Sequence, residues 1–269
     1  MLIAPDKFKG SLTAEQVAAA VAAGIHDVRP ARAVRTVPVA DGGDGTVDAA
    51  LAAGFTPVSV SAQGPTGEPV DAVIAVRDGV AVIETAAACG LVRLPGGRLA
   101  PLTASSFGAG DLVRAALDAG CRTIVLGVGG SASTDGGAGM LQALGAGVFD
   151  AAGASLSPGG GALGDVARVD MSTVDGRLVG AEIVLACDVD NPLLGATGAA
   201  ATFGPQKGAD AGQVERLDRG LARWANVLGA VTGRDVADAP GAGAAGGIGY
   251  AALAGLGAMR RPGIELLLE

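Results

Sequence analysis

The sequence contains few aromatic residues and no long apolar run. Aromatic side chains make up 3% of the 269 residues while 49% are hydrophobic, so the core must consist of alanine, valine, leucine and isoleucine. No stretch reaches the roughly 18 consecutive apolar residues that a membrane-spanning helix requires. We therefore expect no membrane association, and the amino terminus lacks the basic and apolar regions typical of a signal peptide.

Positive charge and cysteine are also scarce. The 19 lysines and arginines are outnumbered by 27 aspartates and glutamates, which gives a formal net charge of −8. Because no basic run is interleaved with aromatic residues, we expect no nucleic-acid binding. Cys89, Cys121 and Cys187 are too widely spaced for a disulfide framework or a CxxC metal pattern. These features together predict a cytoplasmic protein.

Glycine, by contrast, is abundant, with 46 of 269 residues against a usual share of about 7%. Short apolar runs alternate with helical patterns, which is typical of an α/β enzyme with many tight turns. Residues 58–83 differ, because three strand-like runs follow one another without room for helices. We therefore predict an α/β fold of two domains, with a boundary near residue 60.

Local patterns predict several further elements. Strands are expected at residues 2–4, 37–39, 123–126 and 183–186, and helices at 47–53 and 140–144. Thr13 and Gln16 form a capping box before a first helix. Asp210 precedes a helix with one apolar stripe that includes Trp224, which we expect to lie in the core.

Four polar, glycine-bearing loops follow predicted strands, the position where open α/β sheets bind ligands. They are residues 4–11, 41–46, 129–137, and 188–191 together with 203–208. The three lysines of the chain, Lys7, Lys9 and Lys207, all lie in these loops. An acidic protein that binds a polyanionic substrate needs such local positive charges and a metal ion. Solvated surface lysines are the alternative, but this placement favours function, and we expect Lys207 on a surface loop.

Two other chemistries were weighed. The Asp41 block could be a plain turn, and it lacks the glutamate that a calcium loop requires. The loop from Gly127 to Ala132, with Asp150 further on, fits a dinucleotide-binding pattern, so an NAD-dependent dehydrogenase of a small hydroxy acid is the second candidate. A Walker-type phosphate loop is absent. The residues alone thus predict a phosphate-handling α/β enzyme.

At these loops the sequence resembles the bacterial glycerate kinases of type 1. The matching blocks are APDKFKGS (4–11), ADGGDGT (40–46), GVGGSASTDGG (127–137), CDVDNPL (187–193), FGPQKG (203–208), PGAGAAGG (240–247) and RPGIE (261–265). The blocks are collinear over the whole chain. The family usually has serine at position 7, glutamate at position 44 and Thr-Asn at 133–134, where this chain has Lys7, Asp44, Ser133 and Thr134.

The resemblance implies two α/β domains. Residues 1–60 with 260–269 would belong to a flavodoxin-like parallel-sheet domain, and residues 61–259 to an inserted domain resembling the restriction-endonuclease fold. Family members continue beyond RPGIE. We therefore expect an incomplete first sheet, an open apolar surface along residues 2–4 and 37–39, and weak or no kinase activity from this chain. An inactive fragment is thus a further alternative.

The resemblance also implies the reaction, the transfer of the γ-phosphoryl group of ATP to D-glycerate. The product 2-phosphoglycerate is favoured, although the sequence leaves the phosphorylated carbon open. Asp41, Asp188 and Lys207 are the expected catalytic residues, and Asp41 and Asp188 are also the expected Mg²⁺ ligands. The residues expected to bind the cofactor or another anionic group are Lys9, Ser11, Gly129, Gly130, Ser131, Asp135, Asn191 and Gln206. A homodimer is compatible with the sequence.

Overall fold

The computed structural model describes residues 1–5, 11–12, 14–36 and 45–262. Its main feature is a six-stranded sheet in the order β10-β9-β6-β5-β4-β3. These strands are β3 (Thr56–Gln63), β4 (Pro69–Arg77), β5 (Val80–Glu84), β6 (Thr123–Gly127), β9 (Glu182–Ala186) and β10 (Met259–Arg261). The predicted α/β class is confirmed.

The sheet has an antiparallel half and a parallel half. Strands β3, β4 and β5 pair antiparallel in sequence order, which confirms the prediction of consecutive strands over residues 58–83. Strands β5, β6, β9 and β10 pair parallel. Parallel neighbours require crossover connections, and here these contain the helices α4 (Phe107–Asp118), α5 (Ala138–Ala143), α7 (Ala211–Thr232) and α8 (Ile248–Gly255).

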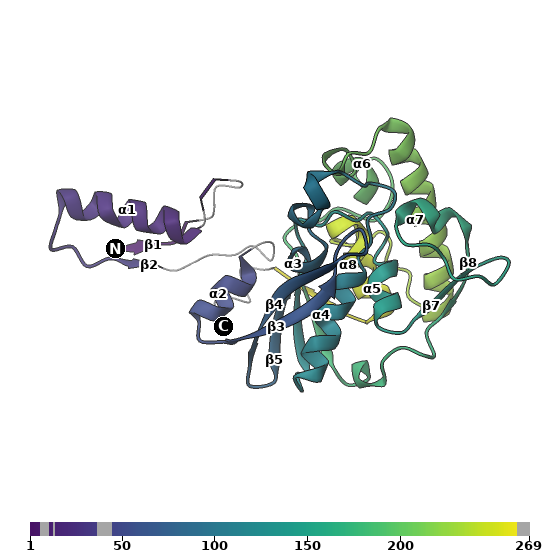
Figure 1. Ribbon diagram of the computed structural model, residues 1–269, viewed down its shortest axis with the longest axis horizontal. Helices are drawn as coiled ribbons and strands as arrows, with labels where there is room; N and C mark the ends of the chain where they lie inside the picture. Colours follow the sequence, from purple (N-terminus) through teal and green to yellow (C-terminus); the bar gives the residue numbers. More distant parts are fainter. Residues whose placement is uncertain (6–10, 13, 37–44, 263–269) are drawn as a thin grey trace.

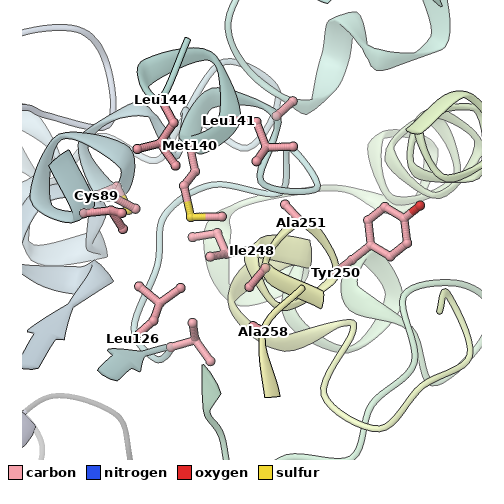
Figure 2. Packing of buried hydrophobic residues seen from close by; sticks show 14 of the residues in the cluster. Cys89, Leu126, Met140, Leu141, Leu144, Ile248, Tyr250, Ala251 and Ala258 are labelled. Carbon is pink, nitrogen blue, oxygen red and sulfur yellow. The ribbon is translucent and has the colours of Figure 1, made fainter. Parts of the chain in front are cut away.

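Successive side chains along the parallel strands point to opposite faces of the sheet, so the core around the sheet consists of one apolar cluster on each face. Ile124 and Leu126 of β6 point into the larger cluster, whereas Val125 between them joins the smaller one. Figure 2 shows part of the larger cluster, where Leu126, Met140 of α5 and Ile248 of α8 gather. The opposite face is covered by α2 (Thr46–Ala52) through apolar residues such as Val47.

Helix α7 confirms the expected cap and stripe. The Asp210 carboxylate accepts from the Gln213 backbone amide at 2.8 Å, and Gln213 Oε1 accepts from the Asp210 backbone amide at 3.1 Å. Trp224 and its neighbours Leu221 and Leu228 are fully buried. The remaining elements are α3 (Thr85–Cys89), α6 (Ala199–Phe203), β7 (Gly147–Asp150), β8 (Val166–Asp170), and the 3₁₀ helices η1 (Leu91–Arg93), η2 (Pro95–Gly97), η3 (Gly160–Asp165), η4 (Gly176–Leu178), η5 (Pro205–Lys207) and η6 (Ala244–Gly247).

The N-terminal elements form a separate, smaller group. Strand β1 (Leu2–Ile3) pairs parallel with β2 (Arg35–Thr36), and α1 (Ala14–Val28) connects them. Figure 1 shows this group set apart from the six-stranded sheet. Leu2 is 63% exposed, as expected for an open apolar surface along residues 2–4, but Ile3 in the same stretch is 7% exposed, so the expectation is wrong for that residue. The expected strand at 37–39 and the expected cap residue Thr13 lie outside the described residues.

Two elements near the predicted domain limits contact the large sheet. Helix α2, which precedes residue 60, packs on β4 and β5 through the smaller apolar cluster. Strand β10, which overlaps the 260–269 segment, pairs with β9 so that Arg261 lies opposite Ala186. The predicted division into domains stays a prediction. No described helix has the length and apolar character needed to cross a membrane.

Candidate active site

The carboxyl ends of three parallel strands lie side by side in the large sheet. In the register, Glu84 of β5 pairs with Gly127 of β6, which in turn pairs with Ala186 of β9. Residues 128–137, called the glycine-rich loop below, follow β6, and residues 187–191 follow β9. Two of the predicted loops therefore leave the sheet at one edge, where α/β proteins bind ligands.

The first half of the glycine-rich loop is fixed by backbone hydrogen bonds to the segment after β5. The Leu91 amide donates to the Gly130 carbonyl at 3.0 Å, and the Ala132 amide donates to the Cys89 carbonyl at 2.8 Å. The amides of Gly129 and Gly130 have no acceptor among the residues that the structure describes. Gly130 is also exposed, with a φ of 64°. Fixed, unpaired amides of this kind suit an anion.

The second half of the loop contacts η6 and α7. The Gly136 amide donates to the Gly246 carbonyl at 3.0 Å, and the Gly136 carbonyl accepts from Trp224 Nε1 at 2.9 Å. Gly246 has a φ of 72°, and a Cβ there would overlap the Ser133 carbonyl oxygen. Position 246 therefore needs glycine both for its backbone conformation and for the close approach of the two segments.

Asp135 faces the protein interior. Its carboxylate accepts from the Ser106 amide at 2.8 Å and the Ser106 hydroxyl at 2.9 Å. It also accepts from the amides of Gly137 and Gly139 at 3.2 and 3.3 Å. With the residue 1% exposed, the carboxylate ties the loop to the starts of α4 and α5. Its predicted role in cofactor binding stays a prediction.

Lys207 does not lie on the surface, so that expectation is wrong. The residue is 2% exposed, and its Nζ donates to the Ser131 hydroxyl at 3.1 Å and to the Ser133 carbonyl oxygen. Burial lowers the pKa of Lys207 to about 8, although the nearby Asp135 and Cys89 oppose this shift. Burial likewise raises the pKa of the Cys89 thiol to about 12. A buried ammonium thus lies against the glycine-rich loop.

The loops after β9 and before α7 present the other predicted residues. Asp188 is exposed directly after β9, and Gln206 is exposed in η5. Asn191 is half-buried, and its Nδ2 donates to the Thr197 carbonyl at 2.7 Å. The adjacent Asp190 instead pairs with Arg260 at 2.7 Å. Asp188 is therefore the acid of this segment that directly follows the strand.

The two N-terminal loops are described only in part. Lys9 and Asp41 lie outside the described residues, and Ser11 is exposed. The second of these loops, residues 41–46, ends at Thr46, which is buried at the start of α2. The next amide, that of Val47, donates to Glu84 Oε1 at 2.7 Å. This bond brings the end of the second block to the carboxyl end of β5, beside the glycine-rich loop.

Sequence reasoning missed Glu84. It is the last residue of β5 and links α2 to the edge of the sheet at which the loops gather. The signal available was an acid that ends the apolar run of residues 80–84. An acid at the carboxyl end of a buried strand lies at the ligand-binding edge of an α/β sheet.

Comparison with known proteins decides the family. The model of the glycerate kinase family matches residues 1–269. The chain belongs to this family. The glycerate kinase of Bacillus subtilis (strain 168) is 46% identical over 272 residues, an alignment that covers 100% of this chain and 71% of the relative. The glycerate 2-kinase of Escherichia coli (strain K12) is also 46% identical, with coverage of 99% and 71%.

A solved structure agrees with the family assignment. A crystal structure from Salmonella typhimurium LT2, provisionally described as glycerate kinase 2, matches with a TM-score of 0.88 at 46% identity. The match covers 99% of this chain and 72% of that one. The resemblance drawn from the sequence blocks is therefore confirmed.

This glycerate kinase family member lacks the context of a dinucleotide site. In such sites the glycine motif opens directly onto a helix, whereas here the loop continues beyond Ala132 and α5 begins at Ala138. Asp150 ends β7 in a separate two-stranded sheet, where it accepts from the amides of Ala152 and Ala154 at 2.9 Å. The dehydrogenase alternative therefore has no support from the geometry.

Proposed function

We propose that this protein transfers the γ-phosphoryl group of ATP to a hydroxyl of D-glycerate, with 2-phosphoglycerate as the favoured product. The observation that carries the proposal is the family match over residues 1–269, together with 46% identity to a glycerate 2-kinase. Enzymes of this class act mainly by positioning the phosphoryl group and neutralising its charge.

The glycine-rich loop is proposed to bind phosphate. The fixed amides of Gly129 and Gly130 supply donors that are already oriented, and no reorganisation is needed when charge develops on the phosphoryl oxygens. The other positions that we propose for binding the nucleotide or the glycerate carboxylate are Lys9, Ser11, Ser131, Asp135, Asn191 and Gln206.

Mg²⁺ is the metal ion that we propose for this site. Among the described residues no group of three or more histidine, cysteine, aspartate or glutamate side chains could hold a metal. Mg²⁺ bound with ATP needs only one or two carboxylates beside phosphate oxygens and water. Asp188, exposed after β9, offers one carboxylate, and we propose Asp41 as the second. When bound, the ion would neutralise charge on the transferred group.

Asp188 is alternatively the acceptor of the substrate hydroxyl proton. An ionised carboxylate can take this proton as the oxygen attacks phosphorus. Asp188→Asn keeps the size of the side chain but removes its charge, and Asp190→Asn, two residues away, is the matched control. We expect Asp188→Asn to lower the turnover by about 10²-fold or more, and Asp190→Asn by less than about threefold.

The measurement is ADP release in the presence of D-glycerate, coupled to a detecting enzyme. ADP release that depends on D-glycerate supports the proposed reaction and contradicts the expectation of an inactive fragment, whereas its absence in the unsubstituted protein contradicts the proposed reaction. If Asp188→Asn stays within a few-fold of the unsubstituted protein, the role of Asp188 is wrong although the reaction stands. Asp41→Asn is tested in the same assay against Mg²⁺ concentration, because loss of a ligand raises the concentration required.

The wider organisation is also proposed. We retain the two-domain description, a flavodoxin-like unit (residues 1–60 with 260–269) and an inserted unit (61–259) resembling the restriction-endonuclease fold. Within this description, α2 and residues 260–261 of β10 are the parts of the first unit that contact the large sheet. We further propose a cytoplasmic enzyme, because the reaction consumes ATP, and a homodimer, which sedimentation would test. Limited proteolysis with identification of the cleavage sites would test whether the unit boundary lies near residue 60.

A further inference from the structure

Lys207 is in an unusual place for a lysine. It is 2% exposed, although lysine is almost never fully buried unless its charge is paired. The ammonium donates to two residues of the glycine-rich loop, the hydroxyl of Ser131 and the carbonyl of Ser133. The nearby carboxylate of Asp135, 1% exposed, provides the compensating charge.

The two buried charges act on opposite ends of the loop. Lys207 holds residues 131 and 133, which flank the residue whose amide is bonded to the Cys89 carbonyl. Asp135 holds the end of the loop to the first turns of α4 and α5. The amides of Gly129 and Gly130 come immediately before the segment that Lys207 holds. A change at Lys207 is therefore transmitted to these amides through one or two residues.

The backbone of η6 lies close to the ammonium. Gly246 of η6 closes over it, and a Cβ at position 246 would lie 2.9 Å from Lys207 Nζ. The residue is enclosed by protein, so its ammonium is not presented to a ligand at the surface. A direct contact with the transferred phosphoryl group would require the loop to move first.

We propose that Lys207 is a positioning residue, whose buried ammonium holds the glycine-rich loop in the shape that presents the Gly129 and Gly130 amides to phosphate. The loop-holding part stands on the contacts described above, and the catalytic consequence rests on the proposed function. Lys207 acts through the loop and does not touch the substrate.

The test is hydrogen exchange of loop peptides in Lys207→Met, which keeps the length of the side chain and removes its charge. We expect exchange in residues 128–137 to rise by about tenfold or more, because hydrogen bonds from a charged donor are lost. Exchange in β9 should not change. Arg234→Met is the matched control, since it removes a cation's bond to the Ala254 carbonyl away from the loop, and loop exchange should then stay as it is.

A second variant covers the case in which Lys207→Met does not fold. Ser131→Ala removes one acceptor of the ammonium and no charge, so we expect a smaller rise in exchange confined to the same loop. Unchanged loop exchange in the folded variants would overturn the proposal. Exchange raised equally in the loop and in β9 would also overturn it, because Lys207 would then contribute only to global stability.

Kinetics separate positioning from direct catalysis. If Lys207 positions the loop, the KM for ATP should rise severalfold in Lys207→Met, together with a fall in kcat. A fall in kcat alone, with loop exchange and the KM for ATP unchanged, would indicate direct contact and overturn the proposal. If the unsubstituted protein does not phosphorylate D-glycerate, the proposed function fails, while hydrogen exchange still decides whether Lys207 holds the loop.

Discussion

The six-stranded sheet region and the N-terminal elements use the same building units but bury very different amounts of apolar surface. In the N-terminal group, the described core consists of Ile3, Val17 and Ala18, while Leu2 and Val28 are exposed. Apolar clusters cover both faces of the large sheet. Helices α4, α5, α7 and α8 contribute to the cluster on one face, and α2 contributes to the cluster on the other. In Figure 1, α1, β1 and β2 lie apart from the elements of the large sheet.

This difference in buried apolar surface indicates that the large sheet, and not the N-terminal group, holds the loops after β6 and β9 in place. A two-stranded sheet with one helix has marginal stability by itself, whereas a sheet covered on both faces holds its loops firmly. The glycine-rich loop makes hydrogen bonds to residues of α3, α7 and η6. We therefore expect the loops after β6 and β9 to keep their shape under conditions in which α1 exchanges its amide protons.

The largest expected effect is that of Trp224→Ala. Trp224 is fully buried and its Nε1 donates to the Gly136 carbonyl, so the change creates a cavity and releases the loop. We expect the free energy of unfolding to fall by about 3–5 kcal/mol. Urea unfolding followed by far-ultraviolet circular dichroism measures it, because the substitution removes the single tryptophan. A loss under about 1 kcal/mol would mean that the large-sheet core is no better packed than the N-terminal group.

The same chemical change should have opposite signs in the two regions. Gly246→Ala forces a Cβ against the Ser133 carbonyl at a φ of 72°, so we expect a loss of about 1–3 kcal/mol and reduced phosphate binding. Gly24 lies within α1, and a Cβ there would meet nothing within 4 Å. Gly24→Ala should stabilise α1 by about 0.5–1 kcal/mol. Thermal unfolding of both variants gives the signs, and equal signs would contradict the comparison.

A smaller effect on the large sheet is expected from Ile3→Ala. Ile3 is 7% exposed in β1, so its truncation should loosen the N-terminal group and speed exchange in α1. Unfolding followed by Trp224 fluorescence reports on the large sheet. The free energy of unfolding measured in this way should change by less than about 0.5 kcal/mol, because the two sites are distant. A shift as large as that of Trp224→Ala would show that the two regions unfold as one unit.

Elements with a strong local signal could be predicted from the sequence. The consecutive strands at 58–83, the buried runs of β6 and β9, and the cap at Asp210 all depend on neighbours in the chain. The loops of the site could also be located, because glycine and acids follow buried strands. Features that depend on partners distant in the sequence could not be predicted in this way.

Lys207 and Glu84 illustrate that limit. A lysine between glutamine and glycine looks solvated, and only the fold brings it to Ser131 and the buried Asp135. Glu84 looks like the polar end of a strand, and only the fold places its carboxylate at the Val47 amide. Whether a charge is buried depends on tertiary packing. Composition and spacing therefore predicted the loop that contains Lys207 but not the burial of its side chain.

The smallest expected effect is the dependence of stability on pH. It arises in the large-sheet region, where burial shifts the pKa values of Lys207 and Cys89. Burial lowers the pKa of Lys207 from 10.5 to about 8, so between these values the unfolded chain binds a proton that the folded chain has lost. Stability from this group therefore rises with pH in that window, by at most about 1.4 kcal/mol per pH unit. Cys89, with its pKa raised from 9.0 to about 12, acts with the opposite sign above pH 9.

Over the interval from pH 8 to 9, comparison with Lys207→Met separates the contribution of Lys207 from that of the thiols, with Asp135 and Cys89 as the titratable groups beside Lys207. We expect the unfolding free energy of the unsubstituted protein, relative to Lys207→Met, to increase over this interval in urea titrations. Exchange in residues 128–137, corrected for the intrinsic pH dependence, should increase as well, since the neutral amine holds the loop less firmly. Stability and loop order would then change in opposite directions. A difference between the two proteins that stays flat from pH 8 to 9 would mean that Lys207 keeps its charge in the folded state throughout.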